Sequence, residues 1–343
     1  MSNSMNDILF AMQQKNLVYN ANFLYYSNKA VVNSLVTFNH PDGWIYQDSG
    51  SKGEVSFDET TQSCLIQKST GNSIMTFKQV VSEFPRWRKV LCGQKVSACA
   101  LISNPAAAQT NFELTFSMND GISTSSKTFF FNSNEKKEIC IELNVGQDAK
   151  KLELSLACST EKAIILIEKV YANVGNMALD TLSCMVNGVI GERKQYIATE
   201  NPPAEELSLC YAAIELDNNY TRLNSVINKR FGEGLNGNSM LLDMRGYFSR
   251  AWDNGAQVDT DANTRTAPGT GTIKGDQVST FEHDIFLKHD HGLKFAINKS
   301  IPTGDKTPAT IIDISGTSRT DIDRDGEETR PKNIAELYTI KWA

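Results

Sequence analysis

Two histidines separated by one residue are the candidate metal ligands in this chain of 343 residues. In His289-Asp290-His291, both imidazoles would face the same side of a β-strand, because alternate residues of a strand point one way. Imidazole nitrogens bind several divalent transition metals. The alternative is a pair of exposed histidines without a metal. His283 is a second candidate ligand or, instead, a hydrogen-bonded structural histidine.

Aromatic side chains in or near predicted loops are the candidates for contact with a glycan. Sugar rings present apolar C–H faces that stack on Trp and Tyr, while neighbouring amides and carboxylates bind the hydroxyl groups. The alternative for each side chain is packing in a core, which is the commoner fate of aromatic residues. The candidates are Trp44, Tyr46, Trp87, Tyr247 and Trp252.

The residue types argue against an enzyme. The sequence contains neither a Gly-Xaa-Ser-Xaa-Gly elbow nor a P-loop motif, and only 4 histidines are available for acid–base work. Glycoside hydrolysis needs two paired carboxylates, and the 40 acidic residues leave such a pair open. We therefore expect a binding protein, with a glycan-degrading enzyme as an alternative.

The composition narrows the classes of partner. A formal net charge of -6 and a pI of about 5.4 give no electrostatic reason to expect a nucleic acid or an anionic membrane. No apolar run reaches membrane-spanning length, and no signal peptide is evident. The 7 cysteines are irregularly spaced and most lie in apolar runs, so we expect reduced, buried thiols in a protein assembled in a cytosol.

Residues 1–15 are expected to form an N-terminal anchoring helix. Met5, Ile8, Leu9 and Met12 recur at helical spacing and form one apolar stripe. A helix this short needs a surface to pack on, which is either its own first domain or a larger particle. We favour the particle.

Residues 16–176 have the pattern of strands. Leu152, Leu154 and Leu156 alternate with polar residues, and clusters of Gly, Asn, Asp and Ser separate the apolar segments. The continuous apolar run at 128–131 is expected to be covered on both faces. Many short strands with polar turns predict an antiparallel β-sandwich.

Residues 177–235 are expected to form a linker that contains helix. The segment 205–215 follows a Pro-Pro break and has acidic residues at its start, which favours a helix. Leu223, Val226 and Ile227 have the spacing of a further helical seam.

Residues 236–343 contain little apolar material for a domain of their own. In particular, 253–280 hold Asp, Asn, Thr and Gly with few apolar anchors, and such a stretch cannot bury enough surface alone. Three chains that share one core would solve this problem. Around the axis of such a trimer, His289 and His291 would supply six nitrogens, which suits an octahedral metal.

The last third of the chain resembles the tail-fibre and tail-collar proteins of bacteriophages. Residues 329–333, Thr-Arg-Pro-Lys-Asn, precede a final strand that ends in Ile-Lys, as in that family. Residues 242–253 match its Pro-Asp-Leu-Arg-Gly-Xaa-Phe-Xaa-Arg-Gly-Trp-Asp segment, with Leu242 in place of Pro and Ala251 in place of Gly. The resemblance implies an intertwined trimeric tip that binds a receptor, with iron or another octahedral divalent metal on the trimer axis.

Residues 16–176 resemble the carbohydrate-binding jelly rolls carried by phage fibres and glycan-active enzymes. Residues 16–23 look like the opening strand, 41–44 like a Pro-Xaa-Gly-Trp turn and 167–175 like the closing strand. This resemblance implies that the sandwich binds a glycan or serves as a spacer.

These features together predict a mainly β homotrimer that serves as a tail fibre or receptor-binding protein of a phage or phage-like contractile particle. Its N-terminus would bind other tail or baseplate proteins, and it would attach the particle to cell-surface polysaccharide, without nucleic-acid binding or membrane insertion. We expect it in a virion or phage-tail-like particle, assembled in the bacterial cytoplasm. The alternative is a structural collar or baseplate protein without a receptor.

Overall fold

The computed structural model describes residues 2–27, 41–48, 53–68, 70–71, 73–105, 110–283 and 333–343. The chain divides into two compact units, Met1–Glu282 with Glu336–Ala343, and His283–Ala335. The fold described below belongs to the first unit. The metal candidates His289 and His291 and the predicted turn at 329–332 lie outside the described residues.

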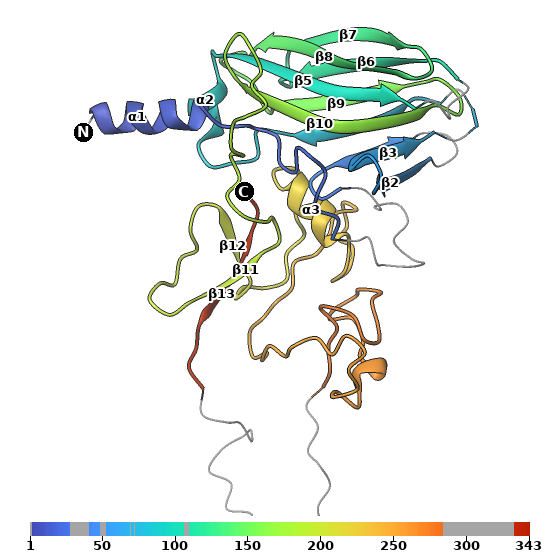
Figure 1. Ribbon diagram of the computed structural model, residues 1–343. Helices are drawn as coiled ribbons and strands as arrows, with labels where there is room; N and C mark the ends of the chain where they lie inside the picture. The colour runs from blue at the N-terminus through green and yellow to red at the C-terminus, as the bar shows by residue number, and fades with distance from the viewer. Residues whose placement is uncertain are drawn as a thin grey trace, which may run out of the picture. The chain divides into compact units, whose positions relative to one another are not determined.

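Two antiparallel sheets form a β-sandwich, which confirms the predicted mainly β jelly roll (Figure 1). In the described part of the chain each sheet has five strands. The first sheet has the order β1 (Ile45–Asp48), β4 (Met75–Val80), β9 (Glu153–Cys158), β6 (Phe112–Asn119), β7 (Thr124–Phe131). The second has the order β2 (Glu54–Asp58), β3 (Ser63–Gln67), β10 (Ile164–Val174), β5 (Lys95–Asn104), β8 (Glu135–Asn144).

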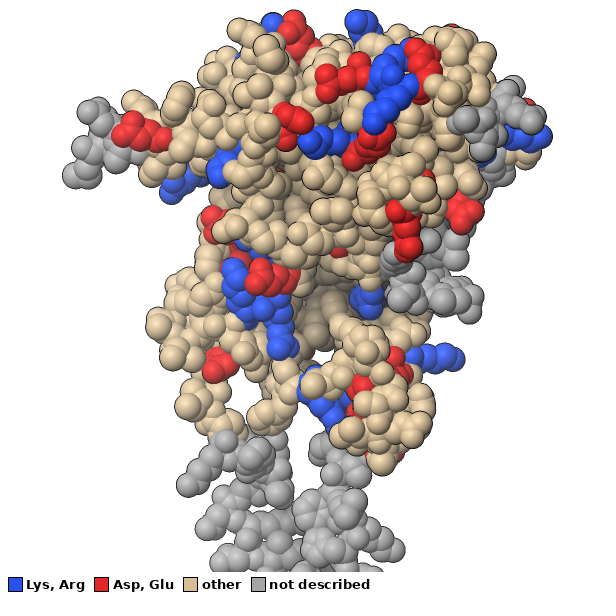
Figure 2. All heavy atoms as spheres, in the orientation of Figure 1, with Lys and Arg blue, Asp and Glu red and all other residues tan. Residues whose placement is uncertain are grey.

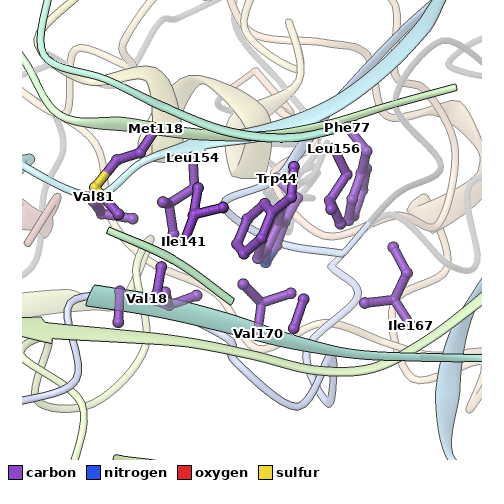
Figure 3. Packing of buried hydrophobic residues seen from close by; sticks show 14 of the residues in the cluster. Val18, Trp44, Phe77, Val81, Met118, Ile141, Leu154, Leu156, Ile167 and Val170 are labelled. Atoms are coloured by element: carbon purple, nitrogen blue, oxygen red, sulfur yellow. The ribbon is translucent and has the colours of Figure 1, made fainter. Parts of the chain in front are cut away.

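The core of the sandwich forms because alternate residues of each strand point inward. On β6, Leu114, Phe116 and Met118 are buried, while the residues between them are partly or fully exposed. Leu154 and Leu156 on β9 follow the predicted alternation and lie in the same core. Figure 3 shows these inner side chains filling the space between the two sheets.

Strand β7 corrects the expectation that residues 128–131 are covered on both faces. It lies at the edge of the first sheet and pairs with β6. Phe131 is buried, but Phe130 points outward and is 49% exposed. The inward position of Lys127, opposite Phe116, keeps a charge at this edge, which is a common protection against pairing with another chain.

The N-terminal helix α1 spans Ser2–Gln13 and lies beside the short helix α2 (Trp87–Leu91). Leu9 and Met12 pack against the core of the sandwich, as part of the predicted apolar stripe. Met5 and Ile8 from the same stripe are exposed. The helix is therefore docked along one side and uncovered along another.

The predicted opening strand at 16–23 is not a regular strand. The segment lies beside β10, because the N–H of Leu17 donates to the carbonyl of Ala172 at 2.8 Å and the N–H of Val170 donates to that of Ala21 at 3.0 Å. Asn20, between these bonds, and Phe23, after them, have positive φ, which breaks the extended conformation.

A second, smaller core follows the sandwich. A three-stranded sheet has the order β11 (Arg193–Tyr196), β13 (Leu337–Lys341), β12 (Glu206–Ser208). Helix α3 (Thr221–Ile227) contributes Leu223, Val226 and Ile227, in agreement with the predicted seam. Because Ile340 of β13 joins the same core, the expected boundary between 235 and 236 does not separate two cores.

The predicted helix at 205–215 is wrong, because residues 206–208 form β12 instead. The Glu206 carboxylate accepts hydrogen bonds from Lys194 Nζ and Tyr196 Oη, both at 2.9 Å, and from Thr339 Oγ1 at 2.5 Å. These partners lie on the other two strands of the sheet, so tertiary contacts override the local helix preference. The residues after β12 are irregular up to α3.

A buried ion pair connects the second core to the sandwich. Glu83, which follows β4, accepts the backbone N–H groups of Thr221 at 2.7 Å and Arg222 at 2.9 Å, and so caps the N-terminus of α3. The Arg222 guanidinium lies 3.4 Å from the same carboxylate, and both side chains are buried. Ser225 Oγ also accepts the N–H of Gly43, at 2.9 Å.

The cysteines are not all reduced, which corrects the expectation of free thiols. Cys99 and Cys140 are directly opposite on β5 and β8 and form a disulfide. The other five cysteines are free. Among them, burial raises the pKa of the Cys64 thiol to about 12, so this thiol is inert at neutral pH.

Among the helices described above, none combines the length and the apolar character needed to cross a bilayer.

Candidate functional site

Trp44 lies inside the sandwich, which corrects its assignment to a glycan surface. It is 1% exposed, and its ring stacks on Phe77 with centroids 4.7 Å apart and planes 6° from parallel. Phe23 covers it from another side. Figure 3 shows the Trp44 ring directed into the core. The turn is formed as expected, since the N–H of Trp44 donates to the carbonyl of Pro41 at 3.0 Å, but the indole stabilises the fold.

Tyr46 and Trp87 are half-buried at different elements of the sandwich. Tyr46, on β1, packs against the core, and burial raises the pKa of its phenol. Trp87, at the start of α2, also packs against the core, and the Arg88 guanidinium lies 5.3 Å from its ring centroid. Both residues are partly exposed.

Tyr247 and Trp252 are the two predicted residues that are exposed and contact the same later segment of the chain. Tyr247 is 44% and Trp252 is 50% exposed. The Tyr247 ring contacts Phe281 edge-on at 5.4 Å, and Trp252 Nε1 donates to the carbonyl of Asp276 at 3.3 Å. Both therefore lie against residues 276–281. We call Tyr247, Trp252 and Phe281 the aromatic patch.

The turn after Trp252 is closed by the carboxylate of Asp253. It accepts the backbone N–H groups of Gln257 at 2.8 Å, Val258 at 2.9 Å and Asp259 at 2.8 Å. These bonds, that of Asp259 above all, lower the pKa of Asp253, because they favour the ionised form. The backbone that carries Trp252 is thus fixed by polar contacts rather than by a local apolar core.

Four charged side chains hold the rest of this segment. Asp259 bridges Arg250 at 3.2 Å and Arg265 at 2.8 Å. Glu282 bridges the same two arginines at 3.4 and 3.5 Å. Asp259 and Arg265 are largely buried, so solvent screens their pair less than an exposed one. A 3₁₀ turn at Ala262–Thr264 lies inside this network.

The arrangement suits the binding of a hydroxylated ligand. The exposed indole and phenol offer faces for C–H groups, while the nearby carboxylates and guanidiniums are hydrogen-bond partners for hydroxyls. Figure 2 shows basic and acidic side chains intermixed on the displayed face, so that neither sign dominates there.

Sequence reasoning missed Phe281 and the bridging role of Glu282. Neither belongs to the family segment that contains Tyr247 and Trp252. Phe281 follows Tyr247 by 34 residues, and Glu282 follows Trp252 by 30 residues. An isolated bridge between Thr266 and Phe281 brings the two parts of the segment together. No sequence pattern predicted this pairing.

The predicted metal ligands His289 and His291 are outside the described residues, so their metal stays a prediction. Among the described residues, Cys99, Glu138 and Cys140 place ligand atoms within 4.8 Å of one another. The two sulfur atoms are joined in the disulfide and are not available as thiolates.

Only part of this chain is similar in sequence to the known relative described below. No protein-family model matches the chain. The relative "Protein RhiB" of Rhizobium leguminosarum bv. viciae is 33% identical over 103 residues, which are 30% of this chain and 47% of the relative. The chain thus spans less than half the length of this relative.

Solved structures with a similar fold include carbohydrate-binding modules and a phage protein. TmCBM61 in complex with β-1,4-galactotriose has 10% identity and a TM-score of 0.34, over 47% of this chain and 99% of that one. The enzymatically active domain of tailspike protein 4 of bacteriophage CBA120 has 13% identity and a TM-score of 0.31, over 47% and 21%. With TM-scores this low, we base the function on the site itself.

Proposed function

We propose that this protein binds glycans through the aromatic patch, as an attachment protein of a phage tail or a phage-like contractile particle. The observation that carries the proposal is the exposure of two rings with ordered contacts: the Trp252 indole donates a hydrogen bond to the backbone, and the Tyr247 ring packs edge-on against Phe281. Exposure of an apolar indole ring to water is unfavourable, and stacking of the ring on a sugar face removes this unfavourable hydration.

Self-association into a homotrimer is part of this proposal. Among the described residues between 45 and 174, in the sandwich, the exposed large apolar side chains are Ile74, Ile122 and Phe130. Between 177 and 282 they are Met177, Leu179, Val189, Ile197, Tyr211, Ile214, Leu235, Tyr247, Phe248, Trp252, Val258 and Val278. Exposed apolar surface on this scale supports burial against further copies. Three copies would make weak glycan contacts collectively tight.

The uncovered part of α1 supports attachment to a larger particle. Met5 and Ile8 are exposed beside the docked Leu9 and Met12, so the helix offers a second apolar surface to other tail or baseplate proteins. We place the protein in a virion or phage-tail-like particle assembled in the bacterial cytoplasm. We propose a binding role rather than catalysis, with iron or another octahedral metal held by His289 and His291 of three copies.

Replacement of Trp252 by alanine tests the glycan site. We expect Trp252→Ala to weaken binding to target cells and their purified surface polysaccharide by about ten-fold, since a stacked aromatic ring contributes on the order of 1 to 2 kcal/mol. Phe130→Ala is the matched control, because it removes a similarly exposed ring from the sandwich. Equal binding by Trp252→Ala and the unchanged protein would refute the site.

Two alternatives predict different results in the same assays. A structural collar or baseplate protein would bind neither the cells nor the polysaccharide. A glycan-degrading enzyme would release reducing sugar from the polysaccharide, and replacement of one carboxylate would abolish this release.

A further inference from the structure

The disulfide between Cys99 and Cys140 lies on the outer face of the second sheet. On β5, the neighbours Ala98 and Ala100 point into the core, so Cys99 between them points outward. Cys140 is directly opposite Cys99 on the edge strand β8. The two residues differ in accessibility, because Cys140 is exposed and Cys99 is buried. A small thiol from solvent therefore reaches Cys140 first.

Glu138 places a carboxylate beside the two sulfur atoms. It precedes Cys140 by two residues on β8, so both side chains point to the same face of the sheet. One carboxylate oxygen and the two sulfur atoms all lie within 4.8 Å of one another. A disulfide needs no carboxylate, whereas thiolate sulfur and carboxylate oxygen are both ligands of zinc. In the reduced state the cluster therefore has the donor atoms of a metal site with three protein ligands.

Tyr171 fixes the direction of the Glu138 carboxylate. It lies opposite Cys99 on β10, and its hydroxyl donates a hydrogen bond to Glu138, so the side chain reaches across β5 to β8. Because Tyr171 is only 5% exposed, packing holds the donor in place. Carboxylates that bind metals in proteins are commonly oriented by a further hydrogen bond of this kind. The cluster thus has an outer contact as well as three donor atoms.

The strands keep the two cysteines opposite each other even without the covalent bond. β5 and β8 pair along their whole length, from Lys95 opposite Asn144 to Asn104 opposite Glu135. Loss of the disulfide therefore leaves both sulfur atoms beside the Glu138 carboxylate. A metal that enters from the solvent side meets the exposed Cys140 and Glu138.

We propose that reduction of the Cys99–Cys140 bond turns this cluster into a site for a divalent metal of the zinc class. The thiolate of a small thiol attacks the Cys140 sulfur, and the electron pair of the broken bond goes to the Cys99 sulfur. A second thiol then takes the attached group from Cys140 as a small disulfide. The metal binds both sulfur atoms as thiolates together with Glu138, and two protons are released. A small disulfide reverses these steps and expels the metal.

The two states correspond to two redox environments. Thiols stay reduced in a cytosol, whereas disulfides persist outside the cell. The site would hold its metal during the proposed assembly in the cytoplasm and lose it after release of the particle. This last step rests on the proposed function, whereas the metal site itself does not.

Titration of the reduced full chain with cobalt(II) tests the site, because thiolate ligands give a charge-transfer band in the near ultraviolet. We expect this band to saturate at one cobalt per chain. Cys140→Ser should abolish the band. Tyr171→Phe, which removes only the orienting hydroxyl, should weaken cobalt binding by about ten-fold, and Glu138→Gln by at least as much. The matched control is Cys92→Ser, because Cys92 is a partly exposed free cysteine outside the cluster.

A measurement on the unchanged protein does not depend on the folding of a variant. Oxidised glutathione added to the cobalt-loaded chain should release the metal and lower the count of thiols from 7 to 5. The inference is overturned by a reduced chain without the band, by a band that survives in Cys140→Ser, or by metal that stays bound after the two thiols are lost. Cobalt held only by His289 and His291 has no sulfur ligand, so the band separates this site from the proposed histidine site.

Discussion

Removal of the Glu83 carboxylate is expected to destabilise the second core more than any single exposed change. Three groups at the start of α3 donate to this carboxylate: the N–H of Thr221, the N–H of Arg222 and the Thr221 hydroxyl. The residue at the usual capping position, Tyr220, makes no side-chain cap bond, so Glu83 alone provides this cap. Glu83→Ala would also leave the guanidinium of Arg222 buried without its charge partner.

The expected size of the effect follows from this burial. Breaking one side of a buried ion pair costs about 3 to 5 kcal/mol, whereas removing both charges together is far less costly. Glu83→Ala should therefore lower the free energy of unfolding by about 3 to 5 kcal/mol, and the double variant Glu83→Gln with Arg222→Met should lose much less. The control is Glu142→Ala, which breaks an exposed pair with Lys95 and should cost below about 1 kcal/mol.

Urea denaturation at pH 7, followed by tryptophan fluorescence, measures these differences. Trp342 reports on the junction of the two cores, because it packs against both and its ring contacts Tyr220 edge-on at 5.2 Å, whereas Trp44 reports on the sandwich. We expect the unfolding midpoint to fall to a lower urea concentration in Glu83→Ala. A loss in Glu83→Ala no larger than in Glu142→Ala would refute the reasoning that this pair joins the two cores.

Two further predictions concern acid stability and the trimer axis. Burial alone would raise the pKa of Asp120, but three backbone N–H groups donate to its carboxylate and hold that pKa below its usual range. The stabilisation by these bonds is present above the unfolded pKa of Asp120 and is lost as the pH falls through its folded pKa, so Asp120→Ala should lower the free energy of unfolding by about 3 kcal/mol at neutral pH. On acidification to about pH 3, the variant should then lose less stability than the unchanged protein. A pH profile of stability parallel to that of the unchanged protein would contradict this. Solution mass with metal analysis should find three chains and one iron or similar metal per three chains, and the metal should be lost in His289→Ala with His291→Ala; a monomer would contradict the trimer, and a trimer without metal would contradict the histidine site.

The sandwich was predictable because each of its signals is local. The alternation of Leu154 and Leu156 with polar residues follows directly from the geometry of a strand, and the turn at 41–44 needs only adjacent residues. The buried fate of Trp44 was not predictable, because it depends on Phe77 and Phe23, which reach it from other elements.

The second core was harder to predict because its contacts join distant residues. Local signals favoured a helix at 205–215, but Glu206 is bound by side chains of β11 and β13. For the aromatic patch, the sequence identified Tyr247 and Trp252, yet it gave no sign that Phe281 contacts Tyr247. Pairings of this kind depend on which distant segments meet, and single-residue preferences carry no information on that.

Because β13 lies between β11 and β12, residues 209–336 leave the three-stranded sheet after β12 and return to it at β13. The two ends of this segment are held together, since the N–H of Leu209 donates to the carbonyl of Tyr338 at 2.8 Å. A protease that cuts the chain within this segment would therefore produce two fragments that stay associated through the sheet. Deletion of β13 would have the opposite effect, because β11 and β12 would become unpaired edges that are prone to aggregation.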